Sequence, residues 1–400
     1  MESDNKLFLL DAYALIYRAY YAFIKNPRIN SKGFNTSAIL GFVNTLEEVL
    51  KKENPSHIGV AFDPSGPTFR HEAFEQYKAQ REETPEAIRL SVPIIKDIIH
   101  AYRIPILEVA GYEADDVIGT LATEAGRQGI TTYMMTPDKD YGQLVTDNVF
   151  MYRPKHTGGF EVMGIEEVKA KFDIQSPAQV IDMLGLMGDA SDNIPGCPGV
   201  GEKTAQKLIA EFGSIENLLE HTDQLKGALK TKVETNKELI TFSKFLATIK
   251  IDVPIQLEMD KLVREQADED SLRQIFEELE FRTLIDRVLK KENSAGGVTM
   301  ATGSKTATAK SAPSPLPLFP EEGGAIQGDL FANFTGNDAG EAKKSNLETL
   351  ETLNCDYQLI DTEKKRTEII QKLLTSKILS LDTELSLIHI SEPTRQAEIS

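Results

Sequence analysis

The first 290 residues predict an α/β fold, with a mostly parallel central sheet flanked by helices. Short apolar runs of strand length alternate there with longer amphipathic stretches of helical period. Aspartates follow three of the apolar runs, at the position where open α/β sheets bind ligands. A hydrophobic fraction of 40% can fill a sizeable core, and 400 residues lead us to expect two or three structural units.

The composition excludes several classes of protein. No apolar run approaches the ~18 residues that cross a bilayer, and the run Leu7–Leu10 is too short for a signal peptide. Cys197 and Cys355 lie far apart, which fits a reducing cytoplasm and not a disulfide scaffold. A formal net charge of −18 argues against a generally basic nucleic-acid binder, unless many of the acids are gathered in one metal site.

The composition changes near residue 290. From about Ser294 to Ser345 the chain is rich in Ala, Gly, Ser, Thr, Pro and acids, which bury too little apolar surface to fold. We expect order to return near Tyr357, where one strand–helix–strand unit ends in the sequence LDTE. A unit of that size is too small to be stable alone.

The most informative residues of the first segment are acids that follow predicted strands. Two strands end at Asp11 and Asp63, and a third leads into Asp138 and Asp140. Because parallel strands end at the same edge of a sheet, we expect these side chains to converge. Taken singly, each aspartate has an ordinary alternative role as a helix N-cap or turn former.

Two further acidic groups follow. In GYEADDVIGTLATEA, the first turn of a predicted helix contains Glu113, Asp115 and Asp116, where the helix dipole favours anions. In GLMGDASDNIPG, Asp189 and Asp192 stand three residues apart. An acidic first turn and a plain turn are the ordinary interpretations of these two segments.

Nine carboxylates in one site would repel one another. At a separation of about 5 Å and an effective dielectric near 20, each neighbouring pair costs roughly 3 kcal/mol. Cations are the expected remedy at neutral pH, because the aspartate pKa is about 4. Oxygen ligands select Mg²⁺ or Mn²⁺ over zinc, and two such ions about 4 Å apart stabilise the attacking and leaving oxygens of a phosphodiester.

A glycine-rich segment, NIPGCPGVGEKTAQKLIAEFG, predicts a phosphate-binding turn. Gly196, Gly199 and Gly201 precede a helix that is expected to begin near Glu202 and to end at a glycine C-cap. Backbone N–H groups at such a helix start bind phosphate, and Lys203 adds a cation. An ordinary helix–turn–helix corner explains the same pattern.

The segment FRHEAFEQYKAQRE combines cations with aromatic rings, as single-strand binding surfaces do. If the segment forms a helix, Arg70, Phe74 and Lys78 fall at positions i, i+4 and i+8 on one face, with Tyr77 and Arg81 beside them. The predicted DNA contacts in it are Arg70, Phe74, Tyr77, Lys78 and Arg81. Arg18 lies about two helical turns after the first strand, where it would meet a phosphate that enters the metal site; a generic surface arginine is the alternative.

Five ordered motifs carry a resemblance to a known family. LLDAYALIYRAYYA, AFDPSGPTFRHE, GYEADDVIGTLA, TPDKDYGQLV and GLMGDASDNIPGCPGVGEKTA resemble the 5′-nuclease domains of bacterial DNA polymerase I, within the flap-endonuclease superfamily. The likeness spans residues 1 to about 290. It implies a PIN-like catalytic domain over residues 1–175, a helical DNA-binding region with a helix–three-turn–helix over 176–290, and a flexible linker over 291–345.

The resemblance also implies roles for individual residues. The first ion would be held by Asp11, Asp63, Glu113, Asp115 and Asp116, and the second by Asp138, Asp140, Asp189 and Asp192. Lys78 and Arg18 resemble the family's cations at the scissile phosphate. The glycine hairpin would grip duplex DNA and seat a K⁺ ion on backbone carbonyls, while Phe74–Arg81 resembles the arch through which a 5′ strand threads.

Residues 346–384 resemble the start of a 3′–5′ exonuclease domain of RNase H-like fold, in which Asp382 and Glu384 would bind metal. The pattern then breaks, and residues 385–400 (LSLIHISEPTRQAEIS) resemble translated sequencing-adapter read-through. We expect this tail to be non-native and the polymerase domain to be absent, so that the chain neither polymerises nor proofreads.

The predicted linker contains a short candidate docking motif. Gln327, Leu330 and Phe331 in QGDLF resemble the peptide by which bacterial replication enzymes bind the sliding clamp. Chance apolar residues in a tolerant linker are an equally good interpretation.

The resulting hypothesis is a monomeric, bacterial, cytoplasmic nuclease that removes 5′ flaps or RNA primers at nicks, without a membrane partner. The main alternative is a non-catalytic DNA-junction binder on the same fold, although such a protein has no need of nine carboxylates. A single-strand RNA nuclease is a third possibility, against which the duplex-gripping glycine hairpin argues.

Overall fold

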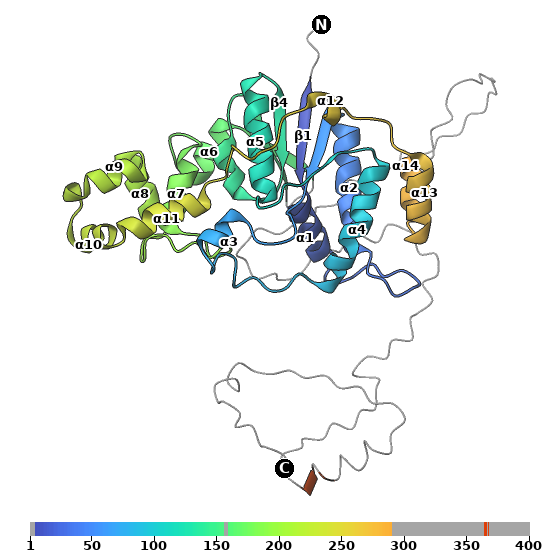
Figure 1. Cartoon of the computed structure of the whole chain (residues 1–400), viewed down its shortest axis with the longest axis horizontal. Helices are drawn as coiled ribbons and strands as arrows, with labels where there is room; N and C mark the ends of the chain where they lie inside the picture. Colours follow the sequence, from blue (N-terminus) through green and yellow to red (C-terminus); the bar gives the residue numbers. More distant parts are fainter. Residues whose placement is uncertain (1–4, 156–158, 290–363, 366, 368–400) are drawn as a thin grey trace, which may run out of the picture. The chain divides into compact units, whose positions relative to one another are not determined.

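The computed structural model describes residues 5–155 and 159–289, together with residues 364, 365 and 367. At the centre is a six-stranded sheet of order β3-β2-β1-β4-β5-β6 (Figure 1). Its strands are β1 (Lys6–Asp11), β2 (His57–Ala61), β3 (Ile106–Leu107), β4 (Thr131–Met135), β5 (Val149–Pro154) and β6 (Phe160–Met163). Neighbours pair in parallel except β6, which is antiparallel to β5, so the predicted mostly parallel α/β sheet is confirmed.

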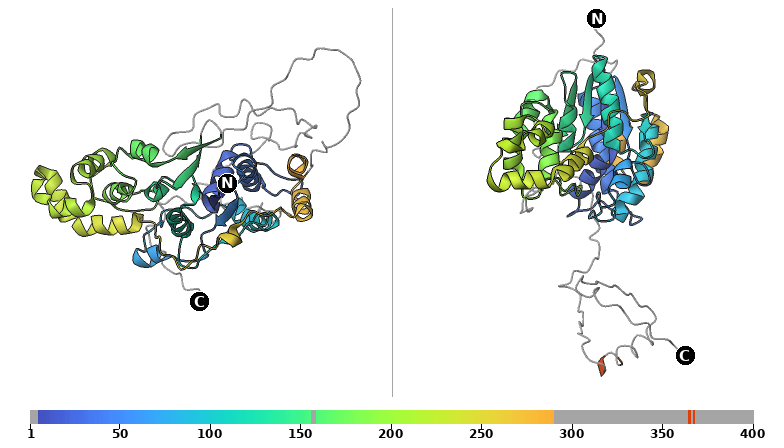
Figure 2. Two further views of the ribbon diagram at one scale, coloured as in Figure 1. Left: turned by 90° about the horizontal axis from the view of Figure 1, so that it is seen from above. Right: turned by 60° about the vertical axis from the view of Figure 1, so that its left-hand side comes forward.

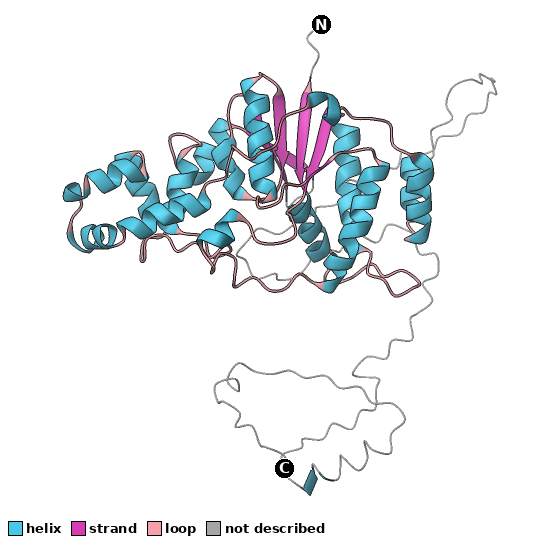
Figure 3. Cartoon of the chain, viewed as in Figure 1, coloured by secondary structure: helices cyan, strands magenta, loops and turns pink. Residues whose placement is uncertain are grey.

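Both faces of the sheet are covered, which explains why β1 is a continuous apolar run and not an alternation. Leu7 and Leu9 belong to one core, Phe8 and Leu10 belong to the other, and all four are fully buried. Helices lie on both sides of the strands in Figure 2 and Figure 3. On the Phe8 side they are α1 (Ala12–Ala22), α2 (Ser37–Lys52), α4 (Glu86–Ala101), α13 (Glu269–Glu278) and α14 (Arg282–Leu289).

The Leu7 side of the sheet continues into a helical region, which lies to the left in Figure 1. α5 (Ala114–Arg127) packs on the sheet itself, against β4 and β1. The other helices on this side are α6 (Ile165–Phe172), α7 (Gln179–Met187), α8 (Glu202–Phe212), α9 (Ile215–Glu220), α10 (Gly227–Thr235) and α11 (Lys237–Ala247). α8 ends at Gly213, whose φ of 79° suits a glycine C-cap, so the predicted helix is confirmed at both ends.

Short elements complete the described part. They are α3 (Phe69–Ala73), α12 (Met259–Leu262) and the 3₁₀ turns η1 (Lys139–Leu144) and η2 (Thr222–Gln224). Within the ranges that the structure describes, no helix is both long and apolar enough to cross a membrane.

Some sequence predictions lie outside the described residues. These are the structure of the linker, the 3′–5′ exonuclease residues Asp382 and Glu384, the docking motif Gln327, Leu330 and Phe331, and the tail 385–400.

Candidate metal centre

The first carboxylate group surrounds the N-terminus of α5. Glu113 is the N-cap of this helix, and carboxylate oxygens of Glu113, Asp115 and Asp116 lie within 4.8 Å of one another. Asp63, from the loop after β2, accepts a hydrogen bond of 2.7 Å from the backbone N–H of Ala114. Asp63, which follows a strand, therefore lies beside the acidic first turn of α5, as the sequence predicts. The helix dipole favours negative charge at this position.

Asp11 links this group to the neighbouring strands. It ends β1 and caps α1 by accepting a hydrogen bond of 3.1 Å from Ala14 N. Its second oxygen accepts bonds from the hydroxyls of Thr136 (3.3 Å) and Tyr141 (3.2 Å). Burial, followed by repulsion from Asp63, raises the pKa of Asp11 to about 7. A metal-free centre therefore holds a proton here under near-neutral conditions.

The second group combines the 3₁₀ turn after β4 with the turn after α7. Asp138 accepts a hydrogen bond of 2.9 Å from Asp140 N and so begins that 3₁₀ turn. Asp189 accepts from the backbone N (2.7 Å) and Oγ (2.6 Å) of Ser191 and pairs with Lys139 at 2.9 Å. Burial, then Asp138 and Asp189, raise the pKa of Asp140 well above its ordinary value.

Tyr77 and Lys78 join the two groups. The Lys78 ammonium lies 2.7 Å from Glu113 Oε1 and 3.6 Å from Asp192 Oδ2. The Tyr77 hydroxyl lies 3.0 Å from Glu113 Oε2 and 3.1 Å from Asp192 Oδ2. Lys78 has a φ of 56°, and its backbone N–H donates to Asp192 O at 3.0 Å. A non-glycine residue is strained in this conformation, and such strain is typical of functional sites.

The predicted helical stripe through residues 69–82 is wrong. α3 ends at Ala73, and Phe74 is extended, with φ −147° and ψ 99°. Arg70 (1% exposed) and Tyr77 (3% exposed), expected to contact DNA, instead face the carboxylates. The attraction between the Arg70 guanidinium and the carboxylates of Glu113 and Asp116 keeps this side chain buried and out of solvent. Arg81 stays exposed but pairs with Asp192.

Asp116 belongs to the first carboxylate group, and the protein itself holds its side chain. Its side chain is fully buried, and its two oxygens accept four hydrogen bonds. The donors are Arg70 Nη2 (2.8 Å), Lys250 N (2.8 Å), Arg70 Nη1 (2.8 Å) and Glu113 N (3.1 Å). A carboxylate has about four accepting positions, so all of them are taken. These bonds tie Asp116 to Arg70, to the backbone of Glu113 and to the backbone of Lys250.

We therefore expect Asp116→Asn to lower the free energy of unfolding by about 1.5–3 kcal/mol, because the buried Arg70 guanidinium loses one of its two close counter-charges and keeps only Glu113. Urea unfolding of the metal-free chain measures this. Asp115→Asn is the matched control, since Asp115 is its partly exposed neighbour. Equal stability of the two variants would show that the hydrogen bonds of Asp116 do not stabilise the fold.

The charges that shift the pKa of Arg18 are not those of the two carboxylate groups. Arg18 is buried on α1, where burial and then Arg153 lower its pKa while Glu48 opposes them.

The glycine hairpin has the backbone geometry that its sequence predicts. Gly196 and Gly199 have φ of 61° and 78°. A Cβ on Gly196 would lie 2.3 Å from Gly188 N, so only glycine fits there. Gly201 is the N-cap of α8, and Lys203 is exposed in its first turn.

Sequence reasoning missed several residues that hold the carboxylates. Lys139 pairs with Asp189, and Tyr141 donates to Asp11. Gln143 donates to the Asp140 carbonyl. The position of Lys139 between two aspartates was a usable signal, whereas nothing in the sequence pattern distinguishes Tyr141 or Gln143 from core residues.

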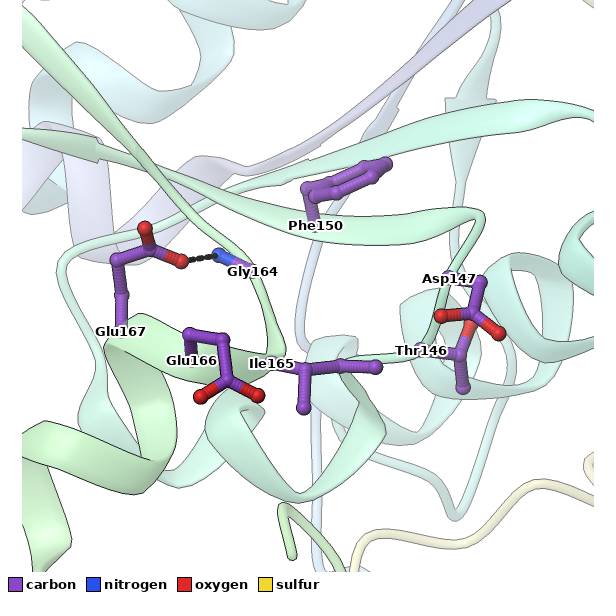
Figure 4. A pocket seen from close by; sticks show the side chains of 7 residues that line it. All are labelled: Thr146, Asp147, Phe150, Gly164, Ile165, Glu166 and Glu167. Carbon is purple, nitrogen blue, oxygen red and sulfur yellow. Dashed lines mark hydrogen bonds between the residues drawn. The ribbon is translucent and has the colours of Figure 1, made fainter.

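A separate cavity of about 380 Å³ opens next to α6 (Figure 4). It is lined by Thr146, Asp147, Phe150, Gly164, Ile165, Glu166 and Glu167. None of the nine predicted metal residues lines it, so the candidate centre is identified by its carboxylates and not by this cavity.

The donors of the centre suit hard cations. All nine predicted ligands offer carboxylate oxygen, the chemistry that divalent magnesium and manganese prefer. Burial, followed by repulsion from Asp116, raises the pKa of Asp115 well above its ordinary value. The chain therefore contains a buried acidic cluster that can bind metal.

Comparison with known proteins places this centre in a family. Residues 6–173 match the family described as 5′-3′ exonuclease, N-terminal resolvase-like domain. Residues 175–270 match the one described as 5′-3′ exonuclease, C-terminal SAM fold. Together the two matches cover all nine carboxylates and the glycine hairpin.

Curated relatives include DNA polymerase I of Bacillus subtilis, 43% identical over 291 residues, which are 72% of this chain and 33% of the relative. DNA polymerase I of Bacillus caldotenax is 40% identical over 287 residues, 71% of this chain and 32% of the relative. The chain thus spans about a third of the length of these relatives.

Among solved structures, the 5′-exonuclease of phage T5 with bound zinc has a TM-score of 0.52 at 22% identity, covering 69% of this chain and 98% of that one. The bacteriophage T5 flap endonuclease in a complex with DNA and metal ions has a TM-score of 0.51 at 23% identity, with 69% and 99% coverage. These similarities establish the fold.

Proposed function

Since residues 6–270 belong to the 5′–3′ exonuclease family, we propose that this chain is a metal-dependent nuclease that hydrolyses DNA near free 5′ ends. The observation that carries the proposal is the joining of two carboxylate groups by Lys78, which lies 2.7 Å from Glu113 and 3.6 Å from Asp192. A cation between two acidic groups is positioned to meet the phosphate that spans them.

The two groups suit two Mg²⁺ or Mn²⁺ ions. Asp11, Asp63, Glu113 and Asp115 would hold one ion, and Asp138, Asp140, Asp189 and Asp192 the other. Bound ions of this kind supply a nucleophilic water and stabilise the leaving oxygen. Lys78 and Arg18 would neutralise charge that develops on the scissile phosphate. The carbonyls of the glycine hairpin would seat a K⁺ ion beside the duplex.

The substrate class follows from the relatives and from the hairpin. One structural relative is a flap endonuclease crystallised with DNA and metal ions, and the curated relatives are DNA polymerase I enzymes. Gly196–Lys203 presents backbone N–H groups and a cation at the start of α8, a geometry that binds phosphate. We therefore propose 5′-flap, nicked and primer-bearing duplexes as substrates.

The test is cleavage of a 5′-flap duplex labelled at its 5′ end. With Mg²⁺ we expect a short labelled product, and with EDTA we expect binding without cleavage. Flap binding without cleavage at any Mg²⁺ or Mn²⁺ concentration would instead support the alternative, a DNA-junction binder. Efficient cleavage of single-stranded RNA with no preference for a duplex would overturn the substrate class.

Lys203→Ala should weaken flap-DNA binding and leave the rate at saturating substrate unchanged. Lys203 is exposed at the start of α8, remote from the contacts of the carboxylates, so its loss removes a duplex phosphate contact. The slope of log K against log[salt] should become less negative by roughly 0.9, the change expected for the loss of one phosphate contact. Binding titrations between 50 and 200 mM salt, about the range over which such contacts respond, measure this. An unchanged slope would remove Lys203 from the duplex surface.

Mg²⁺ should stabilise the chain more strongly as pH rises. The pKa of Asp11 is about 7 in the folded chain against an ordinary value of 3.8, so the folded state binds the extra proton between these values. The stability contributed by Asp11 is complete below about pH 4 and is lost as the pH passes through 7. Since protons and Mg²⁺ compete for the carboxylates, the Mg²⁺-induced rise in Tm should be larger at pH 8 than at pH 6.

Calorimetry in Mg²⁺ and in EDTA measures this rise. Asp11→Asn is the matched variant, because it removes one of the titrating carboxyls and should make the pH dependence smaller, while Asp115 and Asp140 keep their raised pKa. A rise in Tm that is equal at both pH values would contradict the pKa of Asp11.

A polymerase context and a tether on the sliding clamp are further proposals. The relatives are about three times longer than the matched segment, and Gln327, Leu330 and Phe331 provide a clamp-like peptide that lies outside the described residues. Tethering would raise the nuclease concentration at a nick.

A further inference from the structure

We propose that residues 246–250, the C-terminal end of α11 and the three residues after it, form a brace that sets the spacing of the two carboxylate groups. Gln143 is the positioning residue that ties this brace to the second group. This inference rests on the proposed two-ion nuclease site. It concerns residues that hold the proposed metal ligands in position and are not themselves proposed to bind an ion.

Gln143 connects the brace to the second group. Its amide nitrogen donates to the carbonyl of Asp140 (3.0 Å) and to the carbonyl of Ala247 (3.0 Å). Its amide oxygen accepts from the backbone N–H of Ile249 (2.9 Å). The side chain is 9% exposed, so these bonds form away from water, where losing one partner leaves an unsatisfied buried group.

Arg70 and Asp116 connect the same segment to the first group. Arg70 donates to the carbonyls of Leu246 (3.0 Å, from Nε) and Thr248 (2.8 Å, from Nη2), while its Nη1 donates to Asp116 and Glu113. The backbone N–H of Lys250 donates to Asp116 at 2.8 Å. Five consecutive residues thus contribute a backbone bond to the support of one group or the other.

The brace also continues into the glycine hairpin. Ser243, one turn earlier on α11, accepts a hydrogen bond of 3.0 Å on its Oγ from the backbone N–H of Gly196. α11 is a regular helix with Ser243, Leu246 and Ala247 buried on one face. The helix therefore joins the duplex-binding hairpin to both carboxylate groups through buried hydrogen bonds.

The expected consequence concerns metal affinity more than DNA affinity. A two-ion site requires its groups to hold their geometry within about 0.5 Å. Gln143 fixes the peptide of Asp140, which carries one of the proposed ligands. Loss of an outer hydrogen-bond partner of a metal ligand costs about 10–100-fold in metal affinity.

The experiment is calorimetric titration of the full chain with Mn²⁺ alone, for the parent, Gln143→Met and Gln143→Asn. Methionine keeps the volume without the hydrogen bonds, and asparagine keeps the amide but cannot reach both Asp140 and Ala247. We expect at least one Mn²⁺ binding event to weaken about tenfold or more in both variants. The affinity for flap DNA in EDTA should stay within about twofold of the parent, since the hydrogen bonds of Gln143 go to Asp140, Ala247 and Ile249 and to none of the proposed DNA-binding residues.

Gln179→Met is the matched control. Gln179 is also buried, donates to the carbonyl of Gly213 (2.8 Å) and accepts from Gln175 N (2.8 Å), so it supports a helix end away from the carboxylates. The Gln179→Met variant should be less stable than the parent and should bind Mn²⁺ with the affinity of the parent. Gln143 variants that bind Mn²⁺ as tightly as this control would overturn the brace alone. A parent chain that binds no Mn²⁺ would overturn the proposed function, and the brace with it.

Discussion

Asp115→Asn should lower the rate of flap cleavage by about 10³-fold or more, while flap-DNA binding stays within about threefold of the parent. Asp115 is partly exposed, unlike its fully buried neighbour Asp116, and its carboxylate faces Arg70 at 3.9 Å without a close side-chain ion pair. It is therefore the member of the first group that is best placed to give an oxygen to an ion. Losing several kcal/mol of transition-state stabilisation corresponds to about three orders of magnitude in rate.

Single-turnover cleavage with saturating enzyme separates this effect from binding. The substitution keeps the size of the side chain and its acceptor for Asp116 N at 2.7 Å, so the fold should be retained. A Tm within a few degrees of the parent serves as the control. Cleavage within tenfold of the parent would refute the assignment of Asp115 as a metal ligand.

Lys78→Ala should lower the cleavage rate by about 10²–10³-fold and weaken flap binding only slightly. Burial opposes the charged form of Lys78, but Glu113 and Asp192 prevail and raise its pKa, so the ammonium stays protonated across the neutral range. A permanently charged group between the two carboxylate groups stabilises charge that appears only in the transition state.

The comparison with Lys203→Ala makes this prediction specific. Lys78 lies among the carboxylates and Lys203 at the hairpin helix, so the first should change the rate and the second the affinity. Single-turnover rates and equilibrium binding measured on the same flap duplex provide both numbers. If the two variants lose rate and affinity in equal proportion, the division of roles between the lysines is wrong.

The sequence alone predicted the fold class and the location of the acidic centre. Apolar runs that end in Asp11 and Asp63, and the acidic first turn at Glu113, report on strand ends and helix starts, which are local features. Gly213 and the α8 boundaries were predictable for the same reason, because a helix end depends on a few neighbouring residues.

The roles of Arg70, Tyr77 and Asp116 could not be predicted in this way. Helical periodicity suggested an exposed stripe, but Arg70 on α3 and Tyr77 beyond the end of that helix both face carboxylates more than thirty residues away in the sequence. Which side chain is a ligand and which is a support depends on the partners that occupy its oxygens. For Asp116 one of those partners is the backbone of Lys250, 134 residues distant, and only the tertiary packing brings the two together.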